Sequence, residues 1–206
     1  MYNVPYFKAK NEKEVMDFMI RHPFVIITGV GEDHYPVATH VPVLIEEREG
    51  KIFLLAHIKK QTDHHKALIK NEQVLVIFTA AHAYVSASWY QDPQSASTWN
   101  YQAVHAKGKL KFLPEDALLD ILHRLTEKFE NNPSSPSLVT NLPKDYVSKL
   151  MKAIIAFEIE ITEIAHIFKL SQNRDVESYR NIIEHLNEGD GEAKLIASAM
   201  KENIKS

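Results

Sequence analysis

Short runs of apolar residues, several alternating with polar ones, dominate the first half of the chain and predict β-strands. Turn signals such as Gly31-Glu-Asp-His34 and Glu46-Glu-Arg-Glu-Gly50 separate several of these runs. The predicted strands are Phe24–Val30, Pro36–Ile45, Lys51–Ile58, Val74–Ala80, Ala83–Ser88, Val104–Phe112 and Ala153–Ile161. Short strands with few helices between them favour a closed antiparallel barrel over a parallel sheet, and closure also removes exposed sheet edges.

Apolar residues at helical spacing mark several other segments. Asn11 is a candidate N-cap with Glu14 three residues on, and His22-Pro23 ends the first helix because the residue before proline leaves the helical region. The predicted helices are Asn11–Arg21, Asp63–Asn71, Pro114–Asn131, Lys144–Met151, Val176–Leu186 and Glu192–Ile204. The fold class is therefore α+β, mainly β, with flanking helices and a C-terminal helical segment.

The composition is that of an ordinary globular protein, with 45% apolar and 25% charged residues and a net charge of −3. This charge does not favour a dedicated DNA-binding domain. The absence of cysteine excludes disulfides, thiolate metal sites and cysteine nucleophiles. The N-terminus lacks signal-peptide character, and no apolar run approaches the roughly 20 residues of a membrane span. We therefore expect a cytoplasmic protein without membrane contact.

One aromatic-rich stretch is typical of a binding site. His82-Ala-Tyr84-Val-Ser86-Ala-Ser88-Trp89-Tyr90 is followed by Thr98-Trp99-Asn100-Tyr101, and these two words contain both tryptophans of the chain. A core strand favours apolar and β-branched residues, and polar atoms buried there cost free energy unless they are paired. Flat rings among serine, threonine and asparagine suit a planar ligand with a polar rim.

Other site chemistries find little support in the residues. His64 and His65 are adjacent and would point about 100° apart on a helix, and no HExxH word is present, so we expect no metal site. The sequence singles out no residue as an axial haem ligand. The G-x-S-x-G elbow of hydrolases and the glycine-rich phosphate loop are also absent from the sequence, and we name no catalytic residue.

Three short sequence motifs, taken in their order along the chain, resemble the PaiB family of FMN-binding negative transcriptional regulators. They are HAYVSASWY at His82–Tyr90, TWNY at Thr98–Tyr101 and FKLSQNR at Phe168–Arg174. The N-terminal pieces agree, namely Met1-Tyr-Asn-Val-Pro, His22-Pro-Phe24 and Pro36-Val-Ala-Thr-His40-Val-Pro42. The resemblance covers roughly Met1 to Leu186.

The resemblance implies a six- to seven-stranded antiparallel split β-barrel that binds FMN and forms a homodimer with the flavin in clefts between the barrels. We expect a single domain, residues 1–186, to which the helical tail 187–206 also belongs. The implied cofactor-binding residues are Thr39, His40, Lys60, Thr62, Ser86, Ser88, Trp89, Trp99, Asn100, Lys169, Ser171, Gln172 and Asn173.

The sequence departs from the family pattern at a few positions. Ala87 stands where the family often has proline and Thr39 where it often has serine, and Lys60-Gln-Thr-Asp63 replaces a sequence like Arg-Ala-Asn-Pro. Related split barrels hold the FMN phosphate in that loop. Lys59 or Lys60 with Thr62 would supply the phosphate contacts, aided by free N–H groups of the following helix. A split barrel that has lost its flavin is the alternative.

Each candidate also has an ordinary structural interpretation. The loop at Lys59–Gln61 would serve equally as a solvated turn, and Ser171 or Asn173 as the cap of the helix after it. The aromatic residues Trp89, Tyr90, Trp99 and Tyr101 suit either flavin stacking or packing between subunits. His40 suits either the flavin cleft or an ordinary core or surface position.

Two functions follow from the resemblance. The first is a negative transcriptional regulator of sporulation and degradative-enzyme genes. The second is an FMN-dependent oxidoreductase or flavin reductase that uses NAD(P)H, since bound FMN accepts hydride without a protein acid or base. Direct DNA binding has weak support, because the predicted C-terminal helices are joined by the acidic Glu188-Gly-Asp-Gly-Glu192.

Overall fold

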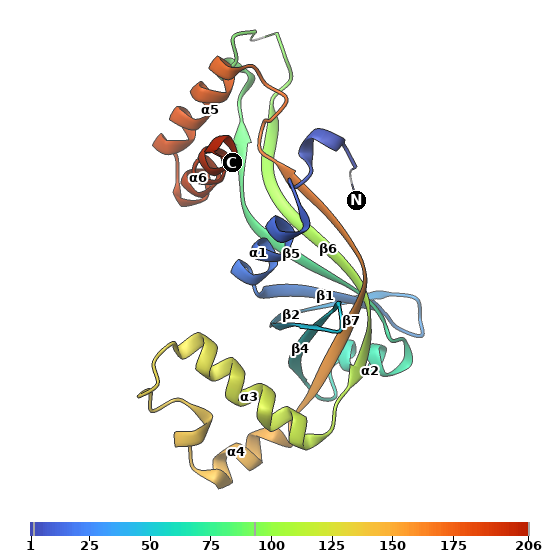
Figure 1. Cartoon of the computed structure of the whole chain (residues 1–206). Helices are drawn as coiled ribbons and strands as arrows, with labels where there is room; N and C mark the ends of the chain where they lie inside the picture. Colours follow the sequence, from blue (N-terminus) through green and yellow to red (C-terminus); the bar gives the residue numbers. More distant parts are fainter. Residues whose placement is uncertain (2, 93, 206) are drawn as a thin grey trace. The chain divides into compact units, whose positions relative to one another are not determined.

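The computed structural model describes residues 1, 3–92 and 94–205. Tyr2 of the N-terminal word and Ser206 at the end of the predicted tail lie outside the described residues. The strands are β1 (Phe24–Val30), β2 (Pro36–Pro42), β3 (Leu44–Arg48), β4 (Lys51–Lys59), β5 (Gln73–Val85), β6 (Thr98–Phe112) and β7 (Ile154–Lys169). They form a seven-stranded sheet in the order β2-β1-β5-β6-β7-β4-β3 (Figure 1).

The helices complete the described chain. The α-helices are α1 (Glu12–Arg21), α2 (Asp63–Lys70), α3 (Glu115–Glu130), α4 (Lys144–Met151), α5 (Val176–Glu188) and α6 (Gly191–Lys205). Short 3-10 helices lie at Pro5–Phe7, Ala87–Trp89 and Val139–Asn141. As predicted, Asn11 caps α1, because its side-chain oxygen accepts a hydrogen bond from the Glu14 N–H at 2.9 Å.

A one-residue link between β2 and β3 forces the sheet to curl. These strands stand at opposite ends of the strand order although Val43 alone separates them. Two consecutive Cα–Cα steps span at most about 7.6 Å, so the two edges must approach each other. Val43 is fully buried, and its N–H donates to the Pro23 carbonyl at 2.8 Å. This is the geometry of a barrel rather than of an open sheet.

The three longest strands differ from their predicted extents. The predicted strands Val74–Ala80 and Ala83–Ser88 are parts of one strand, β5, which ends at Val85. TWNY, left outside a strand by the prediction, forms the start of β6, and β7 continues eight residues past the predicted end to Lys169. Ser86 and Ser88 consequently lie at a 3-10 turn and not in a strand.

The chain divides into two compact units, which we call unit 1 and unit 2. Unit 1 comprises Met1–Met19, Thr79–Val104 and Ala165–Ser206, and unit 2 comprises Ile20–Phe78 and His105–Ile164. The strands β5, β6 and β7 each contribute residues to both. In unit 1, α5 and α6 pack against β5 around a buried cluster that includes Val85, Leu170, Ile182 and Met200.

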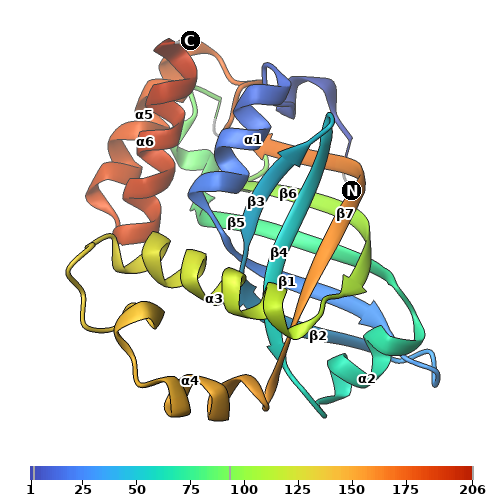
Figure 2. The same ribbon diagram turned by 60° about the horizontal axis from the view of Figure 1, so that its bottom comes forward.

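Unit 2 contains the remaining strands with α2, α3 and α4. A buried cluster of Leu44 and Leu55 on the sheet with Leu118 and Leu125 on α3 holds that helix against β3 and β4 (Figure 2). β4 pairs with β7 in antiparallel register, with His57 opposite Ala156. No helix among residues 1, 3–92 and 94–205 is long and apolar enough to cross a membrane.

A close approach of β6 to β7 requires glycine at position 108. A Cβ added to Gly108 would lie 2.6 Å from the Glu160 carbonyl oxygen and 2.6 Å from the Ile159 Cγ2 atom. Both distances are far inside van der Waals contact, and one of the contacts is with backbone. A side chain here would force neighbouring strands apart.

We predict that Gly108→Ala lowers the free energy of unfolding by about 1–3 kcal/mol, the usual penalty of overpacking. Urea denaturation followed by circular dichroism measures it. Gly191→Ala is the matched control, because a Cβ there meets nothing within 4 Å. Equal stability of the two variants would contradict the close approach.

Candidate functional site

An exposed set of rings in unit 1, which we call the aromatic plate, consists of His82, Tyr84 and Trp99. Alternation along β5 places His82 and Tyr84 on the exposed face, while Ala83 and Val85 point into the core. The Trp99 ring centroid lies 5.7 Å from each of the other two. Tyr84 is 50% exposed and Trp99 51%. The His82 ring is tilted by 40° from the Trp99 plane and the Tyr84 ring meets it edge-on at 70°, so Trp99 itself is the flat exposed face of this set.

Lys169, at the end of β7, is fixed beside Trp99. Its ammonium group donates to the Thr98 hydroxyl and to the Trp99 carbonyl oxygen, the latter at 2.9 Å. Partial burial lowers the pKa of Lys169, and the nearby positive charge of Arg174 lowers it further. An ammonium group has three N–H donors, so one remains for a ligand.

Asn100 and Ser171 face each other in the interior of unit 1. The Asn100 amide donates to the Ser171 hydroxyl at 2.9 Å, and that hydroxyl donates back to the Asn100 carbonyl oxygen at 3.1 Å. Asn100 is 0% and Ser171 3% exposed. This reciprocal pair ties β6 to the turn after β7 and gives both buried side chains a partner within the protein.

Gln172, in the same FKLSQNR motif, also stabilises the turn that follows β7. Gln172 donates to the Phe168 carbonyl and accepts from the Leu170 N–H. Asn173 is exposed, with no hydrogen-bond partner in the described structure. The proposal that Ser171 or Asn173 caps the next helix is wrong, since Asp175 accepts from two backbone N–H groups at the start of α5.

Ser86, Ser88 and Trp89 form the 3-10 turn that follows β5. Ser86 accepts from the Ser88 N–H at 3.2 Å, and the two hydroxyls lie 2.8 Å apart. The Trp89 ring stacks on His185 of α5 with centroids 4.9 Å apart and planes 17° apart. Trp89 therefore packs within unit 1 and is less available to a ligand than Trp99.

Two further aromatic residues that the sequence offered for stacking are also engaged. Tyr90 is buried, and the Arg174 guanidinium lies 3.9 Å from its ring centroid. Tyr101 packs against the cluster of Phe7, Ala103 and Ile167. Trp99 is thus the sequence-predicted ring that stays open to a ligand in unit 1.

In unit 2, Thr39 and His40 lie on the edge strand β2. Thr39 is half-buried opposite Ile27 of β1, and His40 is exposed opposite Ile26. The His40 ring stacks on exposed Phe24 at 6.1 Å between centroids. His40 is thus a surface residue and not part of the core.

The loop from β4 to α2 carries the cations predicted for a phosphate. Thr62 caps α2, since its hydroxyl accepts from the His65 N–H at 3.3 Å and donates to the Lys59 carbonyl at 3.0 Å. Lys59 is exposed and Lys60 half-buried, and within the described residues neither ammonium group has an ion-pair partner. The loop is therefore an ordered turn with unpaired positive charge.

His57, which the sequence analysis did not place in the site, is an orphaned polar group. It lies two residues before Lys59 on β4, and its Nδ1 atom is buried without a hydrogen-bond partner. Burial lowers the pKa of His57, so the ring is neutral at pH 7. A histidine within the apolar run Leu54–Ile58 was the available signal. His82 and Tyr84 could have been identified in the same way, because they alternate with the apolar residues Ala83 and Val85 along the sequence.

Each unit, taken by itself, offers part of the chemistry that FMN requires. In unit 2 the Lys59–Lys60 loop holds unpaired cations of the kind that a phosphate dianion needs, and in unit 1 Trp99 and Lys169 offer an exposed ring and a donor of the kind that an isoalloxazine ring needs. The buried Nδ1 of His57 still needs a partner. Among the described residues, no group of three or more histidine or acidic side chains is placed to hold a metal ion.

Comparison with known proteins agrees with this chemistry. Residues 1–163 match the family model described as a putative FMN-binding domain. The chain is 35% identical over 208 residues to the Bacillus subtilis protein named protease synthase and sporulation protein PAI 2, covering 100% of this chain and 99% of the relative. An uncharacterised protein of Emericella nidulans is 27% identical over 218 residues, covering 86% of this chain and 87% of that one.

Solved structures show the same fold. A protein of Mycobacterium smegmatis, described as binding FAD and heme, superposes with a TM-score of 0.60 at 18% identity. The superposition covers 84% of this chain and 78% of the Mycobacterium smegmatis protein. A conserved hypothetical protein of Mycobacterium tuberculosis gives a TM-score of 0.56 at 14% identity, covering 82% and 90%. The antiparallel split-barrel fold predicted from the sequence is confirmed.

We predict that Asn100→Ala lowers the free energy of unfolding by about 1–3 kcal/mol, because it leaves the buried Ser171 hydroxyl without its partner. Asn173→Ala removes the same group from an exposed position and should change stability by less than about 0.5 kcal/mol. Thermal and urea denaturation measure both variants. Little loss in the Asn100 variant would show that the buried pair does not hold the turn.

Proposed function

The chain belongs to the PaiB family, and on that premise we propose that it is a flavin-binding regulator of gene expression. Its cofactor is FMN, in agreement with the family model that spans residues 1–163. The Bacillus subtilis relative is named for protease synthesis and sporulation, and we extend control of such genes to this chain. The cysteine-free sequence suits a reducing compartment such as the cytoplasm.

The observation that carries the proposal is the exposed aromatic plate with Lys169 beside it. Offset or edge contacts between aromatic rings are worth about 0.5–1.5 kcal/mol beyond the apolar area they bury. Trp99 is therefore proposed to cover one face of an isoalloxazine ring, with the Tyr84 ring edge-on beside it. The remaining N–H of Lys169 would donate to an acceptor on the ring's edge.

For unit 2, taken by itself, we propose a phosphate site in the loop after β4. Lys60 stands where the family pattern has arginine and keeps the positive charge without the planar fork, so it would act as a point charge. The neutral His57 ring would satisfy its buried Nδ1 with a polar group of the cofactor or a water bound with it. When bound, FMN supplies a ring that exchanges electrons or hydride without a protein acid or base.

A homodimer with flavin at the subunit interface is part of the proposal. Large apolar side chains stay exposed in each unit, including Phe24 and Tyr35 in unit 2 and Tyr84 and Trp99 in unit 1. Exposed aromatic residues are enriched where subunits meet. Direct DNA contact is not part of the proposal, because the link between α5 and α6 is acidic.

Titration with FMN and with riboflavin, which lacks the phosphate, tests the two assignments separately. We predict that Trp99→Ala weakens binding of both flavins about three- to tenfold, the loss expected for one stacking contact. Lys60→Met should weaken FMN and leave riboflavin unchanged. Quenching of flavin fluorescence measures each affinity, and Lys149→Met, an exposed change on α4, is the control.

The outcomes separate cleanly. Unchanged binding of both flavins by Trp99→Ala would remove the plate from the site. Equal losses for FMN and riboflavin in Lys60→Met would remove the phosphate assignment. No FMN binding by the unaltered protein at tens of micromolar, an affinity of about 6 kcal/mol or weaker, would show a split barrel that has lost its flavin.

A regulator and a redox enzyme differ in two measurements: transcript levels in the host and oxidation of NADH or NADPH by the purified protein. We predict that deleting the gene in its host raises transcripts of extracellular protease and sporulation genes, and that reintroducing the intact gene restores them. The purified protein with FMN should not oxidise NADH or NADPH catalytically. Steady turnover with unaltered transcripts would instead establish the flavin-reductase alternative.

A further inference from the structure

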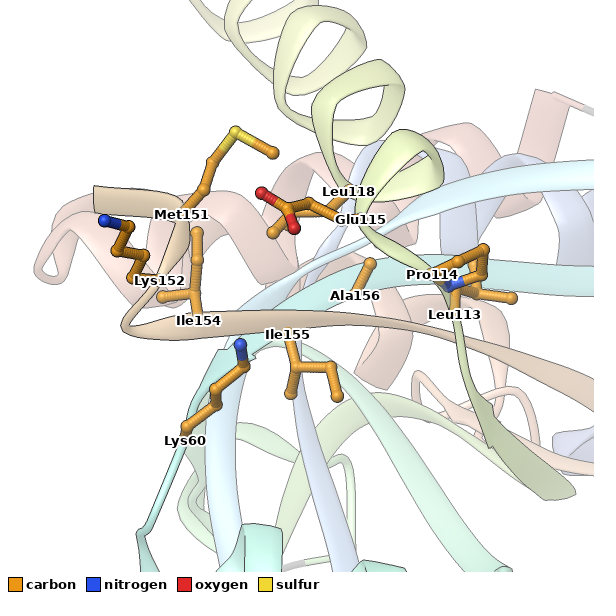
Figure 3. A pocket seen from close by; sticks show the side chains of 10 residues that line it. All are labelled: Lys60, Leu113, Pro114, Glu115, Leu118, Met151, Lys152, Ile154, Ile155 and Ala156. Carbon is orange, nitrogen blue, oxygen red and sulfur yellow. The ribbon is translucent and has the colours of Figure 1, made fainter. Parts of the chain in front are cut away.

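Unit 2 contains a preformed pocket. It opens between the start of α3, the end of α4 and the start of β7, and its volume is about 220 Å³ (Figure 3). Leu113, Leu118, Met151 and Ile154 give it an apolar wall. An engineered apolar cavity of about 150 Å³ holds benzene, so this pocket has room for a somewhat larger body.

Backbone hydrogen bonds hold the walls in place. The Leu113 N–H donates to the Ala156 carbonyl at 2.9 Å, and the Lys60 N–H donates to the Ala153 carbonyl at 2.9 Å. Leu118 and Met151 also belong to the buried cluster that fastens α3 to the sheet. A ligand would therefore enter a site that needs little ordering, which favours binding.

The rim of the pocket carries charges of both signs. Lys60, Glu115 and Lys152 line it, and within the described residues none of the three has an ion-pair partner. Figure 3 shows the Glu115 carboxylate turned toward the Met151 side of the pocket, and Lys60 on the other side of β7, to which Ile155 points. Elsewhere in unit 2, Arg124 pairs with both Glu46 and Asp120. Unpaired charges around an apolar wall suit a ligand that carries both charges itself.

We propose that this pocket binds a free α-amino acid with an apolar side chain, of the size of leucine. The ligand carboxylate faces Lys152, its ammonium group faces Glu115, and its side chain packs on Leu118, Met151 and Ile154. Lys60 is left to the phosphate of FMN, to which it is assigned above. A simple carboxylic acid would leave Glu115 facing a like charge, and a simple amine would leave Lys152 without a partner.

Isothermal titration calorimetry of the full chain tests the proposal with three ligands of one shape. They are leucine, 4-methylpentanoate, which lacks the ammonium group, and 3-methylbutylamine, which lacks the carboxylate. We predict that leucine binds at least about tenfold more tightly than either analogue. Absence of leucine binding up to about 10 mM, where even a millimolar site would be mostly filled, overturns the proposal. Equal affinity for 4-methylpentanoate also overturns it.

Variants of two exposed rim residues locate the site. Glu115→Gln and Lys152→Met should each weaken leucine at least about fivefold, while Glu127→Gln on α3 and Lys149→Met on α4 leave it unchanged. All four residues are exposed, so the fold should tolerate each change. Undiminished leucine binding in both rim variants would place the amino acid elsewhere and overturn the assignment. FMN affinity should be the same in Glu115→Gln as in the unaltered chain.

Discussion

The backbone hydrogen bonding of three long neighbouring strands is the constraint on which the other features depend. β5, β6 and β7 span 13, 15 and 16 residues and lie side by side in the sheet. Buried backbone N–H and C=O groups must be paired, so once these strands align, their side chains have fixed positions. The aromatic plate, Lys169 and the wall of the pocket at Ile154 all lie on these strands.

The sequence predicted much of this architecture because hydrophobic period and caps are local signals. The bounds of β1 and α4 agree with the structure, and Asn11 caps α1 as expected. The strand ends that were missed are rich in polar and aromatic residues, such as Thr98–Tyr101 in β6. There the ladder to the neighbouring strands decides the conformation, and intrinsic propensity is overridden by tertiary contacts.

The same limit applies to the candidate site. Polar residues in the short sequence motifs were interpreted as ligand contacts. In the structure, however, Asn100 and Ser171 hydrogen-bond to each other, and Gln172 accepts a hydrogen bond from the Leu170 N–H. A sequence does not reveal which polar group finds a partner inside the fold. Conversely, His57 is a candidate site residue because its buried Nδ1 atom has no hydrogen-bond partner, which the sequence does not reveal. Trp99 and Lys169, both predicted from the sequence, lie next to each other in the structure, and their role in flavin binding stays a prediction.

The single residue between β2 and β3 also has a consequence for how the chain folds. The hairpins β1–β2 and β3–β4 join residues close in sequence, as in the pairs Val30 with Pro36 and Arg48 with Lys51. The pairing of β4 with β7 joins Phe53 to Glu160 and must close a loop of about a hundred residues, which costs more chain entropy. The short link at Val43 joins both hairpins covalently, so pairing at either end, of β1 with β5 or of β4 with β7, shortens the loop that the other pairing has to close.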